Sequence, residues 1–197
     1  MGFCFRPALI WPVSCHQRMA ALLRSVDSKN KAGGMKSKSL AGGRIDHVAI
    51  AVHDLDAAIS LYRDVFGFHL MAERVTRGQY SGMRSAEMDA GGFSIVLLQS
   101  NAENSQVSRY LSEYGPGVQH IAIEVDDVAR ASEALAKNGM KFSTSVIRGE
   151  GLVQIFTSRD ANSGMMFEFI SRVSGAQGFE QGNVQQLFEQ LEESGAY

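Results

Sequence analysis

One segment of the chain occurs twice, and this duplication restricts the fold more than any other feature. The stretch "HVAIAVHDLDAA", which begins at His47, aligns without a gap with "HIAIEVDDVARA", which begins at His120, at an offset of 120 − 47 = 73 residues. Each copy opens with the period-two alternation of a strand and continues into a helical pattern. A repeated strand–helix unit indicates a fold built from two similar halves.

The rest of each half completes the same unit. Asp54 and Asp126 are expected to begin the two helices, and Gly67 and Gly139 are expected to end them. Each helix is followed by three apolar runs typical of strands, at 68–75, 83–90 and 93–99 in the first half and at 141–147, 152–158 and 165–171 in the second. A βαβββ unit leaves one sheet face uncovered, so we expect an α+β fold in which two units form one half-open mixed β-barrel around a cavity. This order and repeat resemble the vicinal oxygen chelate superfamily, which includes glyoxalases, epimerases, extradiol dioxygenases and antibiotic-sequestering proteins.

Charge divides the chain into an arm and a body. Residues 1–44 carry eight Lys/Arg and one acidic residue (8 − 1 = +7), and the remainder carries eleven Lys/Arg and twenty acidic residues (11 − 20 = −9). We therefore expect residues 1–43 to be a basic flexible arm or targeting segment and residues 44–172 to be a single domain. For the arm, an unstructured tail is favoured over an organelle transit peptide, and a signal peptide is disfavoured because "ALIWPV" is short and contains proline.

The same composition excludes several function classes. An acidic body argues against nucleic acid as the main partner, and no apolar run approaches the roughly 20 residues that span a bilayer. The two cysteines, Cys4 and Cys15, both lie in the arm and imply no disulfide framework. We expect a cytoplasmic protein, with organelle targeting by the arm as the alternative.

The repeated histidines indicate a shared cavity. Alanine beside each imidazole leaves space that a packed core would fill with larger side chains. His53, His69 and His16 are weaker candidates, because they lie in a turn, in an early strand and in the arm. From strand alternation we expect His47 to share a face of its strand with Ile45, Ala49 and Ala51. We expect His120 to share a face of its strand with Val118, Ala122 and Glu124.

A third polar residue fits the same cavity. Glu168 lies between Phe167 and Phe169 in an apolar strand, where a carboxylate is costly to bury unless it is paired or bound to a metal. Taken alone, Glu168 facing solvent would be the simpler interpretation. Because the duplicated fold brings its strand to the strands of His47 and His120, we expect the three residues to hold a metal.

The first repeat lacks a fourth ligand. Aligning Gly92 with Gly164 places Val96 where the second repeat has Glu168. The metal-dependent glyoxalases and epimerases of the superfamily use four protein ligands, one from each of these four strands. Two histidines and one carboxylate with open positions are instead the arrangement preferred by non-heme Fe(II) oxygenases.

The second half carries a narrower resemblance. The segments "SQVSRYLSEYGPGVQHIAIEVDD", "GLVQIFTS", "FEFISR" and "GFEQGNVQQLFEQLEESG" resemble consecutive segments of the catalytic C-terminal barrel of 4-hydroxyphenylpyruvate dioxygenases and of the related hydroxymandelate synthases. The resemblance implies a C-terminal lid helix within 173–197 that closes over the active site. It places the iron ligands on His47, His120 and Glu168. It places the substrate-binding residues on Ser85, Asn101, Gln106, Gln119, Gln154 and Phe156.

This resemblance implies an Fe(II)-dependent dioxygenase of aromatic amino acid catabolism, including that of tyrosine, whose partners are a small aromatic 2-oxo acid and dioxygen. It implies no nucleic acid or membrane partner, and a homodimer is left open. The alternatives are another metal-dependent member (an extradiol dioxygenase, epimerase or lyase) and a non-catalytic small-molecule-binding protein. Met166, Glu180 and Val184 depart from the family pattern, and the chain has no room for the family's additional N-terminal barrel. These departures bear on the substrate more than on the metal.

Overall fold

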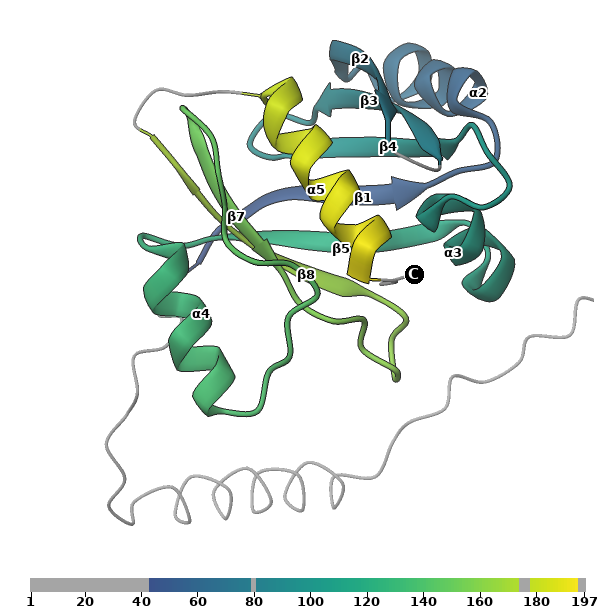
Figure 1. The fold of residues 1–197 in the computed structure, drawn as a ribbon. Coiled ribbons are helices and arrows are strands. Elements are labelled where there is room, and N and C mark those ends of the chain that lie inside the picture. Colours follow the sequence, from purple (N-terminus) through teal and green to yellow (C-terminus); the bar gives the residue numbers. More distant parts are fainter. Residues whose placement is uncertain (1–42, 79–80, 174–177, 195–197) are drawn as a thin grey trace, which may run out of the picture. The chain divides into compact units, whose positions relative to one another are not determined.

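Eight strands form one mixed sheet that curls into a half-open barrel (Figure 1). The computed structural model describes residues 43–78, 81–173 and 178–194; residues 1–42 of the expected arm, with Cys4 and Cys15, lie outside these residues. The strand order is β2-β3-β4-β1-β5-β8-β7-β6. The strands are β1 (Ile45–Ala51), β2 (His69–Arg77), β3 (Gly82–Asp89), β4 (Ser94–Ser100), β5 (Gly117–Glu124), β6 (Ile147–Arg148), β7 (Leu152–Phe156) and β8 (Met166–Arg172). The α+β half-open barrel predicted from the sequence is confirmed.

The two halves of the sheet have the same topology. In the first half β1 pairs in parallel with β4, and in the second β5 pairs in parallel with β8. The antiparallel pair of β1 and β5 joins the halves. Ala49 pairs with Val96, and Ala122, which is 122 − 49 = 73 residues later, pairs with Glu168. Val96 therefore occupies in the first half the place that Glu168 occupies in the second.

Each half carries a helix after its first strand. These helices are α2 (Leu55–Ser60), which continues as one π-helical segment, η1 (Leu61–Val65), and α4 (Val128–Lys137). Asp54 caps α2, as expected. The cap of α4 is Asp127, whose carboxylate accepts from the backbone N–H of Arg130 at 3.0 Å. The prediction of Asp126 was wrong, because the 73-residue offset that relates the halves carries position 54 onto 127.

The helices cover opposite faces of the sheet. Leu55 and Ile59 of α2 and Val128 of α4 pack on the outer face. Helix α5 (Gln181–Ser194) lies on the inner face, where Phe188 is fully buried and packs in one cluster with Ala49 and Ala51 of β1. A further helix, α3 (Gln106–Tyr114), connects the halves; it was not expected. Of the described helices, none is long and apolar enough to cross a membrane.

The run at 141–147 forms much less strand than its composition predicts. Only Ile147 and Arg148 pair with β7, and Phe142 makes a single bridge to Thr157. Side chains replace the missing ladder. The backbone N–H of Phe156 donates to the Thr144 hydroxyl at 3.0 Å, and the backbone N–H of Ser145 donates to the side chain of Gln190 on α5 at 3.0 Å. Hydroxyl-rich segments often make such local substitutes for a sheet ladder.

Candidate metal centre

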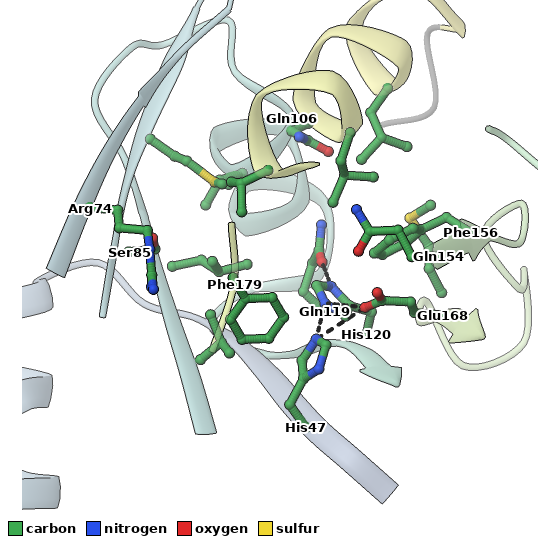
Figure 2. A pocket seen from close by; sticks show the side chains of 18 residues that line it. His47, Arg74, Ser85, Gln106, Gln119, His120, Gln154, Phe156, Glu168 and Phe179 are labelled. Carbon is green, nitrogen blue, oxygen red and sulfur yellow. Dashed lines mark hydrogen bonds and ion pairs between the residues drawn. The ribbon is translucent and has the colours of Figure 1, made fainter. Parts of the chain in front are cut away.

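Three polar side chains from three adjacent strands converge inside the barrel (Figure 2). The Nε2 atoms of His47 and His120 are 3.3 Å apart. Glu168 Oε2 lies 3.0 Å from Nε2 of His47 and 3.7 Å from Nε2 of His120. All three residues are buried. The structure thus brings together the three residues that the sequence predicted as metal ligands.

Two β-bulges aim the histidines into this space. The register between β1 and β5 skips Asp46 on one strand and Gln119 on the other, so each is the extra residue just before a histidine. A bulge changes which face the neighbouring side chains occupy. As a result Ile45 is 46% exposed and is not on the buried face of His47, contrary to the expectation from simple alternation.

The bulge on β5 has a similar effect. Gln119 and His120 are consecutive, yet both line the same cavity, which a regular strand would not allow. Val118 pairs with Ile50, which packs with the cluster beneath α2 on the outer face. The expectation that Val118 shares a face with His120 was therefore wrong, and the bulge is the reason.

Each bulge residue also fixes the ring that follows it. His47 Nδ1–H donates to Asp46 Oδ1 at 2.9 Å, and His120 Nδ1–H donates to Gln119 Oε1. A carboxylate or amide oxygen can only accept, so each ring carries a proton on Nδ1 and directs Nε2 to the shared point. Hydrogen bonds of this kind commonly orient histidine ligands of metals.

An ion pair lies behind His47. Arg172 donates to both carboxylate oxygens of Asp46, at 2.7 and 2.9 Å, and it also donates to the backbone carbonyl of Gly178. Burial opposes ionisation of Asp46, but the hydrogen bonds from Arg172 and His47 hold the pKa of the carboxyl well below its usual range. Asp46 is therefore a fixed negative charge against the ring of His47.

The two imidazoles differ in basicity. Burial disfavours the charged form of His47, but the carboxylates of Glu168 and Asp46 outweigh it and raise the pKa to about 9. Burial and the positive charges of His47 and Arg159 instead lower the pKa of His120 well below its usual value. The unliganded site therefore holds a proton on His47, and a cation bound at the centre would replace it.

The geometry and donor set fit a divalent metal ion. Ligand atoms at about 2.1 Å from a metal, at right angles to one another, are separated by about 3.0 Å, and the three observed separations are 3.0, 3.3 and 3.7 Å. Oε1 of Glu168 is buried and has no hydrogen-bond partner in the described part of the chain. A buried, unpaired carboxylate oxygen is costly, and a cation at this point would compensate it.

The three residues form one end of a cavity of about 70 Å³. Of the residues expected to bind substrate, the cavity is lined by Ser85, Gln106, Gln119, Gln154 and Phe156. Asn101 is not brought to it: it follows β4, is exposed, and its side chain lies beside the backbone of Gly82. Most of the remaining wall is apolar and comes from Met83, Val96, Leu98, Val107, Met166, Phe179, Val184, Leu187 and Leu191.

Gln106 and Gln154 contribute amides to this apolar wall. Gln106 is buried, and its Oε1 has no hydrogen-bond partner among the described residues. Gln154 donates to the backbone carbonyl of Asn183 at the start of α5, at 3.4 Å. One amide thus presents a free acceptor to the cavity, and the other connects the cavity to the helix that covers it.

Several residues of the centre were not found from the sequence. Phe179 was missed; it packs edge-on against His47 with ring centroids 4.8 Å apart, as Phe156, which the sequence did indicate, packs against His120 at 5.1 Å. Arg172 and Arg74 were missed as well, because nothing local in the sequence joins them to the histidines. The remaining described histidines, His53 and His69, are exposed and lie outside the centre; His16 falls outside the described residues.

Of the residues that depart from the family pattern, two lie in the cavity wall and one lies beside it. Met166 and Val184 line the cavity. Glu180 stands before α5, and its carboxylate accepts from the backbone N–H groups of Glu150 and Gly151. Glu180 therefore fastens the start of α5 to the turn before β7, next to the cavity.

Comparison with known proteins agrees with this architecture. A model of the Glyoxalase/Bleomycin resistance protein/Dioxygenase superfamily matches residues 44–169. A 4-hydroxyphenylpyruvate dioxygenase of Legionella pneumophila (strain Corby) is 30% identical over 186 residues, which cover 75% of this chain and 53% of that protein. A mitochondrial methylmalonyl-CoA epimerase of Dictyostelium discoideum is 27% identical over 148 residues, covering 72% of this chain and 88% of the epimerase. The chain spans about half the length of the dioxygenases that it matches.

Solved structures also match this fold. A mutant of 4-hydroxymandelate synthase from Streptomyces coelicolor superposes with a TM-score of 0.69 at 25% identity, covering 77% of this chain and 54% of that one. The methylmalonyl-CoA epimerase of Mycobacterium tuberculosis superposes with a TM-score of 0.59 at 29% identity, covering 71% and 93%. These relatives are thus named as a dioxygenase, a synthase and two epimerases, and they share one fold.

Proposed function

Because this chain belongs to the Glyoxalase/Bleomycin resistance protein/Dioxygenase superfamily, we propose that it is an Fe(II)-dependent dioxygenase acting on an aromatic 2-oxo acid. The observation that carries the proposal is the register of Val96. It stands in the first half where Glu168 stands in the second, and it lines the cavity as an apolar side chain. The chain therefore offers three ligands where a symmetric site would offer four, and one side of the centre stays open to other molecules.

The ligand types support this reaction class. Fe(II) held by two histidines and one carboxylate supplies redox chemistry together with open positions for dioxygen and a chelating substrate. Glu168 contributes the negative charge of the ligand set, and Asp46 and Gln119 hold the rings of His47 and His120 in one tautomer. A 2-oxo acid suits the open side, because its carboxylate and keto oxygens can chelate.

The cavity wall would orient the rest of the substrate. The apolar side chains of Val184, Leu187 and Leu191 on α5 exclude water from the centre. Phe156 offers an aromatic surface, and Gln106 offers an amide to a polar substituent. A mostly apolar cavity with a few placed polar groups is the usual form of a small-molecule site.

The direct test is oxygen uptake by anaerobically Fe(II)-loaded protein with a panel of 2-oxo acids. We expect uptake that requires both Fe(II) and an aromatic 2-oxo acid and releases about one carbon dioxide per dioxygen, as oxidative decarboxylation of a 2-oxo acid requires. The matched variant is Glu168→Gln, which keeps the shape of the side chain but removes its charge. Tight Fe(II) binding without oxygen uptake on any 2-oxo acid would contradict the proposal.

An epimerase is the second candidate, since methylmalonyl-CoA epimerases match over nearly their whole length. Such an enzyme moves a proton beside a thioester carbonyl and needs no dioxygen. Loading the protein with Co(II) and following exchange of substrate hydrogen for deuterium in methylmalonyl-CoA separates the two. Exchange without oxygen chemistry would favour the epimerase, and we expect none.

A further inference from the structure

Arg74 brings a positive charge into the wall of the metal cavity. It lies on β2 and lines the cavity together with Ser85, its paired neighbour on β3. Figure 2 shows Arg74 and Ser85 on the side of the pocket opposite Glu168, with the ring of Phe179 between them. Among the described residues that line the cavity, it is the sole lysine or arginine. The proposed metal chemistry does not use it.

The register of β2 places the charge of Arg74 on the inner face of the sheet, contrary to the usual burial of apolar side chains. Side chains alternate between the two faces of a strand, so a shift of one residue would exchange them. In the observed register Val75, which pairs with Arg84, faces outward and is 51% exposed. Arg74 faces inward, and its side chain is 22% exposed. Burial of apolar surface alone would place Val75 rather than Arg74 on the inner face.

A counter-ion, Glu87, binds Arg74 on the side away from the metal cavity. Nη1 of Arg74 donates to Glu87 Oε2 at 3.2 Å, and the side chain of Glu87 is 6% exposed. Glu87 does not line the metal cavity; it lines a separate hollow that also includes Asp46 and Arg172. A ligand in the cavity therefore meets the guanidinium, while the compensating carboxylate lies on the other side.

Stability gives no sufficient reason for this pair. Replacing a buried ion pair by apolar residues of similar volume is often neutral or stabilising. The other ion pairs of the β2–β3 hairpin join Arg84 to Asp56 and Glu73 and are more exposed, with side chains that are 35%, 75% and 47% exposed. Glu87 also makes a single-point contact rather than the bidentate one that a guanidinium favours with a carboxylate. Within the described residues, this contact uses one of the five donors of the Arg74 fork.

We propose that Arg74 determines specificity by binding a second carboxylate at the end of the substrate away from the metal. The inference rests on the proposed function, since it assumes that a 2-oxo acid occupies the centre. β2 is three strand positions from β1, which carries His47, so the two backbones are separated by about 14 Å along the curved sheet. The arginine side chain shortens this span to one that a phenyl-sized molecule can bridge. The substrate class is then a 2-oxo acid with a second, distal carboxylate.

The test is calorimetric binding to the full-length protein loaded with Zn(II), which does not turn over. The probes are phenylpyruvate, 4-hydroxyphenylpyruvate and 4-carboxyphenylpyruvate. A charge-assisted hydrogen bond contributes about tenfold or more to affinity, so we expect 4-carboxyphenylpyruvate to bind at least about tenfold more tightly than phenylpyruvate. Arg74→Gln should abolish this preference and leave phenylpyruvate affinity within about threefold.

Arg84→Gln is the matched control, because it removes an arginine from the same hairpin on the outer face. It should keep the preference for the carboxylated probe. Arg74→Lys, which keeps the charge but loses the fork, should retain part of it. Metal content and the midpoint of thermal unfolding are measured for each variant. If a variant fails to fold, the preference of the unaltered protein for the carboxylated probe still tests the proposal.

The outcomes separate the two proposals. Binding of all three probes with equal affinity would overturn the role of Arg74 and leave the proposed function standing. An equal loss of affinity for all three probes in Arg74→Gln would also overturn it, since that is the effect of a structural pair. Absence of binding by every 2-oxo acid would overturn both.

Discussion

Asp46 and Gln119 stand at matching β-bulges, 119 − 46 = 73 residues apart, and each accepts a hydrogen bond from Nδ1 of the histidine that follows it. The β-bulge is the same in both halves, but the charge of the side chain that accepts the hydrogen bond differs. Asp46 is charged and paired with Arg172, whereas Gln119 is neutral. The duplicated fold thus holds two imidazoles in one geometry and gives them different basicity.

Asp46→Asn should weaken metal binding about 10- to 100-fold, because loss of a partner behind a ligating histidine typically has that effect. The variant also leaves Arg172 without its carboxylate in a largely buried site, so we expect a loss of stability of about 3–5 kcal/mol. Equilibrium metal titration and urea unfolding measure the two effects. Asp56→Asn, which removes a carboxylate from an exposed ion pair, is the control and should change neither. Unchanged metal affinity in Asp46→Asn would show that the bulge residue has no part in the centre.

Metal uptake near neutral pH should release about one proton. The pKa of His47 is raised to about 9 by Glu168 and Asp46, so the unliganded ring is protonated at pH 7, and a metal binds only the neutral ring. Affinity should therefore rise as the pH increases toward about 9 and level off above it. Calorimetry at pH 7 in two buffers of different ionisation enthalpy gives the number of protons released. A value near zero would contradict the assignment of the charged ring.

Phe188→Ala should destabilise the whole domain by about 3–5 kcal/mol, the usual cost of removing a buried phenylalanine. Phe188 is fully buried and packs against Ala49 and Ala51 on the strand that carries His47. Helix α5 is thus part of the core as well as a cover for the cavity. The control is Gln186→Ala, an exposed position on the same helix. A Phe188→Ala loss as small as that of the control would mean that α5 unfolds independently.

Local patterns were sufficient to predict the halves of the fold. The gapless repeat placed β1 and β5, and the alignment of Gly92 with Gly164 predicted the equivalence of Val96 and Glu168 that the strand register shows. The three expected ligands do come together, because equivalent strands of a duplicated barrel meet at its centre. That they bind a metal stays a prediction.

Features that depend on distant contacts could not be predicted. Arg172 lies 126 residues from Asp46, and no spacing connects them. Bulges have no reliable sequence signature, so simple alternation misplaced Ile45 and Val118. The inward position of Arg74 on β2, next to the exposed Val75, is likewise not indicated by the local sequence pattern.

The most direct test of the central claim is 2-oxo-acid-dependent oxygen uptake by the Val96→Glu variant. Position 96 lines the cavity at the place equivalent to Glu168, so a carboxylate there would supply a fourth protein ligand. We predict that this variant retains a full complement of iron and loses the oxygen uptake of the unaltered protein. Iron-replete Val96→Glu protein that consumes oxygen at the unaltered rate would contradict the claim that the open side of the centre is where the chemistry occurs.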